Sequence, residues 1–326
     1  AVFCYFFRQK EKMGRKDMSA SNTLIGEFRA PRQMLGDQEY DGHLSIHDDK
    51  MAEDLGFAGA PIEGPTHFSQ FVPMLHDVFG DAWFERGCIS AHYQTMVVEG
   101  EEVRVMVEQV ETGGVARINA EKRDGTPVLT GTASLGPDYG ETELDMRRAK
   151  LRPAEQLVIL SELSVGQLGA ANPESARMAM DQNMGAMYPF SLAQKLQKIT
   201  ENHPYYSDDN PWGRAVIPLE MISVLTQYTS GHTGYRTKGP AIGLFAGQEI
   251  KMIDGPLFVD HPYKLEREII ALSESRRTES CWIMTRVIDA DTDTLCAEVI
   301  LNSATLKDSY ANYEADAKAL GKDLSA

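Results

Sequence analysis

Two segments of the chain carry apolar residues at helical spacing. In the second half these positions recur at steps of three and four residues, which is the pattern of a helix buried on one face or more. They are Ile217, Met221, Val224, Leu225 and Tyr228. A similar apolar run follows Gly64 in the first half. We therefore expect central helices at about 65–78 and 217–230.

After each expected helix come four strand-like segments separated by turn residues. In the first half they are Ile89–Val98, Val103–Val110, Ala116–Lys122 and Val128–Leu135, and in the second half Ile242–Ile253, Tyr263–Ser273, Glu279–Ile288 and Thr294–Leu306. Asp124-Gly125 is a strong hairpin signal between two of them. Weaker leading strands are expected at Thr23–Ala30 and about Met184–Phe190. The pattern predicts an antiparallel meander in each half.

The order of these elements occurs twice, which indicates an internal repeat. An apolar helix followed by a meander is the plan of the hotdog fold, in which the sheet wraps a helix that must be covered on several sides. We expect an α+β chain with two tandem hotdog domains whose sheets pair and hide two edges. The domains would be 22–137 and 181–310. Between them, 138–180 is rich in helix-forming residues and predicts a mainly helical linker, and 311–326 would be a C-terminal tail.

Composition narrows the classes of partner. The chain has 326 residues, 42% of them hydrophobic, and a formal net charge of −16. This length suits two domains, and the charge repels nucleic acid and anionic membrane surfaces. It also disfavours an acidic carrier protein, except at one basic cluster, Arg147, Arg148, Lys150 and Arg152. That cluster is either a local basic patch or the solvated face of a linker helix.

Cysteine usage and the start of the chain bear on its compartment. The cysteines are Cys4, Cys88, Cys281 and Cys296. They form no CxxC pair, which favours buried free thiols in a reducing, cytoplasmic compartment and no metal site. The apolar start precedes the basic stretch 8–16, the wrong charge order for a signal peptide, and no apolar run could span a membrane. Met13 and Met18 are both candidate starts, so 1–21 is treated as an N-terminal extension of open status.

The stretch Ile46–Gly64 resembles the MaoC-like branch of the hotdog superfamily, which contains R-specific enoyl-CoA hydratases. The motif of that family reads roughly G-D-x-N-P-I-H-x-D, then G-F, then a Gly-rich turn into the central helix. The matching residues here are Ile46-His47, Asp49, Gly56-Phe57 and Ile62-Glu63-Gly64. In the second half, Glu201 occupies the Asp position and Tyr206 the His position. These two are expected to be structural remnants, as in the non-hydrating half of double-hotdog members.

The resemblance implies catalysis by an Asp–His pair that shares one water. His47 stands at the His position, and its near-neutral pKa suits acid–base work, although it could instead cap a short helix. Gly42 stands at the Asp position. Asp41, one residue earlier, is the candidate partner, unless it only supplies turn chemistry. Asp49 either caps the short helix or takes over proton transfer.

Further candidates lie where the two central helices begin. The Gly64 N–H could hold the thioester oxygen, or Gly64 could be only a turn residue. Glu63 and Glu220 are carboxylates at the helix starts, where some hotdog thioesterases use one, although acidic residues there also stabilise helices. The absence of a P-loop, a dinucleotide fingerprint, a G-x-S-x-G elbow and HExxH removes several enzyme classes.

The leading hypothesis is a hydratase or dehydratase acting on 2-enoyl-CoA or 3-hydroxyacyl-CoA thioesters. The second half would shape the acyl tunnel, and no cofactor is expected. An acyl-CoA thioesterase and a non-catalytic acyl-thioester binding protein remain alternatives. A homodimer also stays open.

Overall fold

The computed structural model describes residues 23–35, 38, 59–108, 114–152, 154 and 156–322. Its strands are β1 (Thr23–Ile25), β2 (Gly87–Tyr93), β3 (Val103–Glu108), β4 (Ala116–Lys122), β5 (Pro127–Leu135), β6 (Glu174–Ala176), β7 (Gly243–Met252), β8 (Tyr263–Glu274), β9 (Thr278–Asp289) and β10 (Leu295–Leu306). The α-helices are α2 (Phe68–Phe79), α3 (Ala82–Arg86), α4 (Glu143–Arg148), α5 (Leu192–Leu196), α6 (Leu219–Gln227) and α7 (Tyr313–Ala319). Short 3-10 helices are η1 (Gly64–His67), η2 (Pro204–Tyr206), η3 (Ser230–His232) and η4 (Lys307–Ser309).

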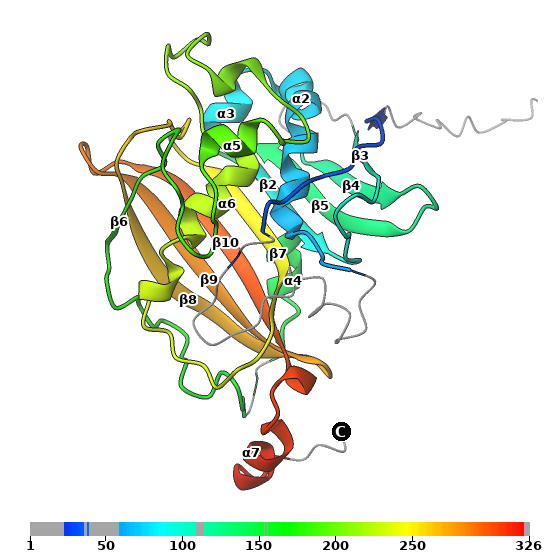
Figure 1. Cartoon of the computed structure of the whole chain (residues 1–326), viewed down its shortest axis with the longest axis vertical. Coiled ribbons are helices and arrows are strands. Elements are labelled where there is room, and N and C mark those ends of the chain that lie inside the picture. Colours follow the sequence, from blue (N-terminus) through cyan, green and yellow to red (C-terminus); the bar gives the residue numbers. More distant parts are fainter. Residues whose placement is uncertain are drawn as a thin grey trace, which may run out of the picture.

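The ten strands form one antiparallel sheet with the order β1-β3-β4-β5-β2-β7-β10-β9-β8-β6. Read outward from the central β2–β7 pair, the two halves have the same strand order. Each half also places its long helix between its first and second strands, so the repeat read from the sequence is a repeat of topology. Figure 1 shows the sheet running behind α2 and α6, the two central helices.

The joint between the halves is the antiparallel ladder of β2 and β7. It runs from Cys88 opposite Lys251 to His92 opposite Gly247. β7 continues to pair with β10 as far as Gly243. The ladder between the two halves of the sheet therefore ends at His92, and the halves diverge beyond it. The expectation that the two sheets join into one is confirmed.

The first central helix follows directly from its sequence. Pro65 stands in the first turn of η1, where its missing N–H costs nothing. Phe68, Phe71, Val72 and Leu75 then recur at helical spacing, and all four are buried. The helix ends at Gly80, whose φ of 63° a glycine adopts without strain.

The second central helix is more fully enclosed. Every residue of α6 except the first, Leu219, is buried, so the helix lies inside its half rather than on one face of it. It is shorter than the expected 217–230, because Pro218 precedes its first residue and the chain turns away after Tyr228.

The segment between the halves differs from its expectation. It was expected to be mainly helical, but within its described residues only α4 is an α-helix. Helix-forming composition is outweighed because the segment docks on the sheet: Leu168 bridges to Glu268, and β6 pairs with β8. The strand expected at Met184–Phe190 is also absent, and β6 takes the edge position in its place.

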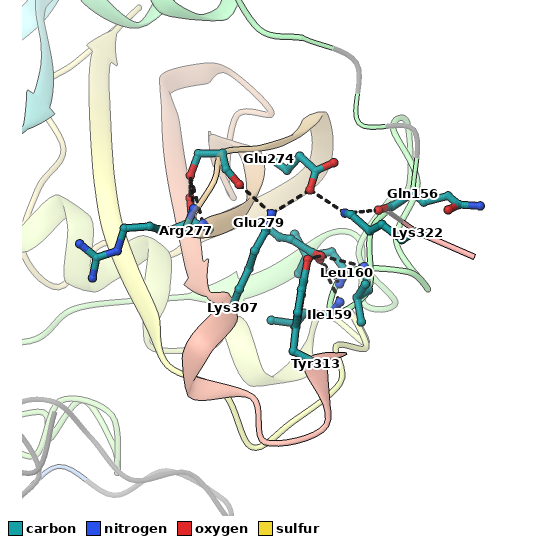
Figure 2. A network of polar contacts seen from close by, with 12 residues as sticks. Gln156, Ile159, Leu160, Glu274, Arg277, Glu279, Lys307, Tyr313 and Lys322 are labelled. Carbon is teal, nitrogen blue, oxygen red and sulfur yellow. Dashed lines mark hydrogen bonds and ion pairs between the residues drawn. The ribbon is translucent and has the colours of Figure 1, made fainter. Parts of the chain in front are cut away.

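Glu279, near the start of β9, holds the linker and the C-terminal helix onto the second half. Its buried carboxylate accepts hydrogen bonds from the N–H groups of Val158, Ile159 and Leu160 at 2.8–3.0 Å, and from the Tyr313 hydroxyl at 3.0 Å. Figure 2 shows this cluster together with Glu274, which binds Lys307 and Lys322. Residues after 310 thus form part of the second half.

Two further expectations concern the interior and the helices. The cysteines in the described ranges, Cys88, Cys281 and Cys296, are buried and form no disulfide bond. Among the described helices, none is long and apolar enough to cross a membrane.

Candidate functional site

A cavity of about 570 Å³ opens where the two halves of the sheet diverge. One wall is the start of η1 and the end of β2, and the other is formed by β7, the β8–β9 hairpin, β9 and β10. Gly64 lines it with its backbone, and the polar side chains of its lining include Glu63, His67, His92, Tyr93, Arg147, Lys150, Trp282 and Asn302. Both halves and the linker therefore contribute to one cavity.

Gly64 begins the helix at the wall of this cavity. A side chain there would overlap the ring of Tyr93, so only glycine fits. Within the described ranges, no group accepts a hydrogen bond from the Gly64 N–H. Since η1 runs straight on into α2, this N–H lies at the positive end of a helix and can stabilise a developing negative charge.

Tyr93 supplies a second potential donor. Its hydroxyl is buried and has no hydrogen-bond partner in the described part of the chain. Burial and the neighbouring Glu63 carboxyl raise the pKa of this phenol well above its usual range. The hydroxyl therefore stays protonated and can donate.

Glu63 is the residue immediately before η1. Its backbone N–H donates to Oε1 of Gln33, and the Tyr188 hydroxyl lies 3.4 Å from its Oε1. Burial raises the pKa of the Glu63 carboxyl to about 7, against the opposing effects of Tyr188 and Lys195. Both protonation states are therefore populated at neutral pH, which suits a proton-transfer group.

His67 lies one helical turn after Glu63 and lines the same cavity. It is 2% exposed, and its Nδ1 has no partner among the residues described. Burial lowers the pKa of this imidazole to about 4. It is therefore neutral at pH 7 and offers hydrogen bonds rather than positive charge.

The basic cluster of the linker is divided between the cavity and the surface. Arg147 and Lys150 line the cavity. Arg147 also pairs with Glu143 at 2.7 Å, and Arg148 pairs with Asp145 at 3.0 Å. Two of the four cations expected on a solvated helix face thus border the candidate site.

At the start of α6, the corresponding position of the second half, side chains fill the space that is open beside Gly64. Glu220 is buried and lies 3.0 Å from Lys195 Nζ, and the Ser69 hydroxyl donates to it at 2.8 Å. The space beside Glu220 is only about 10 Å³, roughly what one water needs. The second helix start therefore has no room for a substrate.

Glu201 and Tyr206 are not brought into one site. Glu201 is partly exposed and pairs with Arg29 at 2.7 Å. The Tyr206 hydroxyl is buried without a partner among the described residues, and burial together with Glu220 raises its pKa. Neither residue lines the cavity.

The structure brings some of the predicted site residues together and does not describe others. Glu63 and Gly64 lie side by side in the cavity wall, whereas His47, Asp41 and Asp49 lie outside the described residues. Sequence reasoning did not identify Tyr93 or Lys195. The only sequence cue for Tyr93 is its place at the end of a strand, and a lysine 25 residues before Glu220 gives no cue that the two meet.

A metal-binding arrangement exists only away from the cavity in the described ranges. His261, Asp289 and Asp291 could hold a cation, but they lie around the β9–β10 turn, at the end of β9 opposite the cavity. The Asp289 carboxylate also accepts backbone hydrogen bonds from Asp291 and Thr292, which accounts for it as turn structure.

Comparison with solved structures identifies the fold of this chain. No family model and no curated protein matches the sequence. Among solved structures, a protein from Chloroflexus aurantiacus J-10-fl described as a MaoC domain dehydratase matches with a TM-score of 0.51 and 13% identity, covering 88% of this chain and 94% of its own. A Mycobacterium tuberculosis protein with a double hotdog fold also matches at 0.51, with 9% identity, covering 89% and 97%. The chain has the double hotdog fold. At such identities the likeness establishes the fold alone, so a function for this double hotdog protein has to be argued from its cavity.

Proposed function

We propose that this double hotdog protein is a hydratase or dehydratase that interconverts a 2-enoyl-CoA and a 3-hydroxyacyl-CoA thioester. One observation carries the proposal: at the wall of the 570 Å³ cavity, the Glu63 carboxyl, with a pKa of about 7, adjoins the Gly64 N–H, which no group of the described residues accepts from. A proton-transfer group and an oxyanion donor side by side are what addition of water to an unsaturated thioester needs.

The proposed chemistry uses these groups in turn. The thioester carbonyl oxygen accepts a hydrogen bond from the Gly64 N–H, with the Tyr93 hydroxyl as a second donor. Ionised Glu63 removes a proton from water as the water oxygen bonds to C3 and negative charge moves to the carbonyl oxygen. The protonated carboxyl then delivers a proton to C2, so one water is added and Glu63 is regenerated. His47 and Asp41 remain predicted proton partners of the same step.

A thioesterase is the second candidate, because the Glu63 carboxylate would serve that reaction too. It would activate water for attack on the carbonyl carbon, and the thiol would leave. The strongly negative net charge of the chain favours CoA over an acidic carrier protein in either case. Tighter binding of the same acyl group on a carrier protein would contradict this preference.

The test follows loss of the enoyl-thioester absorbance and release of free thiol in parallel, across several chain lengths. We expect hydration, and a loss of about 10²–10⁴-fold in Glu63→Gln, typical of removing a general acid–base group. His47→Ala should abolish turnover, and Asp41→Asn should lose a similar factor if Asp41 is its partner. Glu201→Gln is the matched control with a carboxylate outside the cavity.

Each outcome assigns the function. Thiol release without hydration would favour the thioesterase. No change in either signal, with tight acyl-CoA binding retained, would identify a binding protein. Full activity of Glu63→Gln would remove this carboxyl from the mechanism.

A further inference from the structure

The cavity continues from the helix start to the other side of the sheet, where polar side chains from three strands form a row across four neighbouring strands. Asn302 of β10 lies opposite Trp282 of β9 on one side and opposite Gly247 of β7 on the other. Gly247 in turn lies opposite His92 of β2. His92, Asn302 and Trp282, which we name the polar row, all line the cavity.

Each member of the polar row has a hydrogen-bonding atom that the described residues leave unpaired. These atoms are Trp282 Nε1, Asn302 Oδ1 and His92 Nδ1. Trp282 is 2% exposed and Asn302 8% exposed. Buried polar atoms are normally paired, and an unpaired one is costly. Two deeply buried ones on neighbouring strands, both at the wall of one cavity, therefore point to a bound partner.

A register shift between β7 and β10 changes the hydrogen bonding beside the polar row. The β7–β10 register shifts beside Asn302, so that Ala246 of β7 has no partner residue on β10. The Ala246 carbonyl accepts a hydrogen bond from the His92 ring, and Nδ1 of that ring has no partner among the described residues. Bulges often re-aim groups in this way next to functional sites. The row thus offers the indole N–H as a donor, the Asn302 amide oxygen as an acceptor, and a ring nitrogen of His92 that donates or accepts according to its tautomer.

Positive charge borders the same end of the cavity. Arg147 and Lys150 line it from α4 and the residues just after it. Arg147 shares its charge with Glu143. Lys150 is exposed and forms no ion pair with a described carboxylate. An anionic group resting here would be attracted without displacing an existing partner of Lys150.

We propose that the polar row, with Arg147 and Lys150, binds a hydrogen-bonding and negatively charged segment of the thioester ligand. This inference rests on the proposed function, because it takes the reacting carbonyl to lie at Gly64. Two parts of such a ligand have this chemistry. One is the carrier arm of CoA, with its amides and phosphates, and the other is an acyl chain that ends in a carboxylate.

The experiment measures binding by calorimetry with four probes: free CoA, pantetheine, S-hexyl-CoA and S-(5-carboxypentyl)-CoA. The last two are non-hydrolysable thioethers of equal length that differ in the terminal carboxylate. The row variant is Trp282→Phe with Asn302→Leu, which removes the polar atoms and keeps similar volume. Its matched control is Trp212→Phe, because Trp212 lies outside the cavity and donates to Glu85.

We expect the row variant to bind at least one probe about tenfold or more weakly, and the control to bind like the wild type. A loss shared by free CoA and pantetheine assigns the row to the carrier arm. A loss confined to the carboxylated thioether assigns it to the acyl chain. Lys150→Glu, at an exposed position that cannot disturb the core, should weaken the charged probes in a salt-dependent way.

Equal affinities of the wild type and both row and lysine variants for all four probes would overturn the inference and leave the proposed function standing. Failure of the wild type to bind any CoA probe would overturn both.

Discussion

Lys195 Nζ lies 3.0 Å from Oε1 of Glu220, and both side chains are almost completely buried. This ion pair occupies the helix start of the second half, whereas the equivalent position of the first half opens onto the cavity. The two halves share a topology but differ in what fills this one position. The asymmetry leaves one candidate site at the two helix starts in the part of the chain that the structure describes.

Lys195→Met should be strongly destabilising, because it leaves the Glu220 charge buried without its cation. Breaking one partner of a buried pair costs about 3–5 kcal/mol, which urea unfolding would measure. The double variant Lys195→Met/Glu220→Leu should recover most of the loss, since both charges are then absent. A single variant within about 1 kcal/mol of the wild type would show that the pair is open to water.

Glu63→Gln should stabilise the protein above neutral pH. The folded pKa of Glu63 is raised from 4.5 to about 7, so the folded state binds a proton more tightly than the unfolded chain. The favourable contribution is complete below pH 4.5 and is lost as the pH rises through 7. The glutamine variant avoids this loss, by up to about 3 kcal/mol at pH 8. Urea unfolding at pH 4.5 and pH 8 tests it, and a gain of equal size at both would contradict the titration of Glu63.

Glu201→Gln should leave both stability and turnover almost unchanged. The Arg29–Glu201 pair is partly exposed, and such pairs contribute less than about 1 kcal/mol. Turnover measured beside a thermal unfolding curve provides the check. A loss of about 100-fold in turnover, with folding intact, would place the active site in the second half and end the single-site interpretation.

Acid should weaken the contact between the halves at His203. This ring accepts a hydrogen bond from the Tyr205 N–H and lies 3.2 Å from His76, which binds Asp81. Burial, followed by the His76 charge, lowers the pKa of His203 to about 4, so the folded state disfavours the protonated ring. Its stability contribution is complete above pH 6.5 and is lost as the pH falls from 6.5 towards 4, by up to about 3 kcal/mol.

His203→Gln should reduce the loss of unfolding free energy between pH 6.5 and pH 4, as measured by urea unfolding. His232→Gln, at an exposed histidine, is the matched control and should keep the full loss. If both variants keep it, His203 is not the titrating group.

The sequence predicted the strands of the two meanders well, the two leading strands poorly, and the pairing of Lys195 with Glu220 not at all. Alternation of apolar and polar residues located β4 to its observed ends and β8 to within one residue. Such patterns report local burial. They do not report which distant charges meet, so the pairing of Lys195 with Glu220 depends on packing that only the structure provides.

The polar row could not be predicted either, because it depends on the register of the paired strands. Trp282 and Asn302 face each other because of the β9–β10 pairing, and His92 joins the row because Gly247 lies opposite both His92 and Asn302. The register shift then leaves Ala246 without a partner residue on β10. A one-residue bulge leaves no clear mark in an apolar pattern. The helix-start residues Glu63 and Gly64 were accessible to sequence reasoning because they are neighbours in the chain.

During synthesis, β2 must wait for its central partner strand, β7, to be made. β2 ends at Tyr93 and β7 begins at Gly243, so 149 residues lie between the partners. At about 5–20 residues per second, a ribosome needs roughly 8–30 s to deliver the second strand after the first. Throughout that interval the first half carries an open strand edge beside nascent chains from neighbouring ribosomes, and such edges are templates for aggregation. The newborn protein is therefore most vulnerable before its second half emerges, and that is when a holding chaperone would be of most use to it.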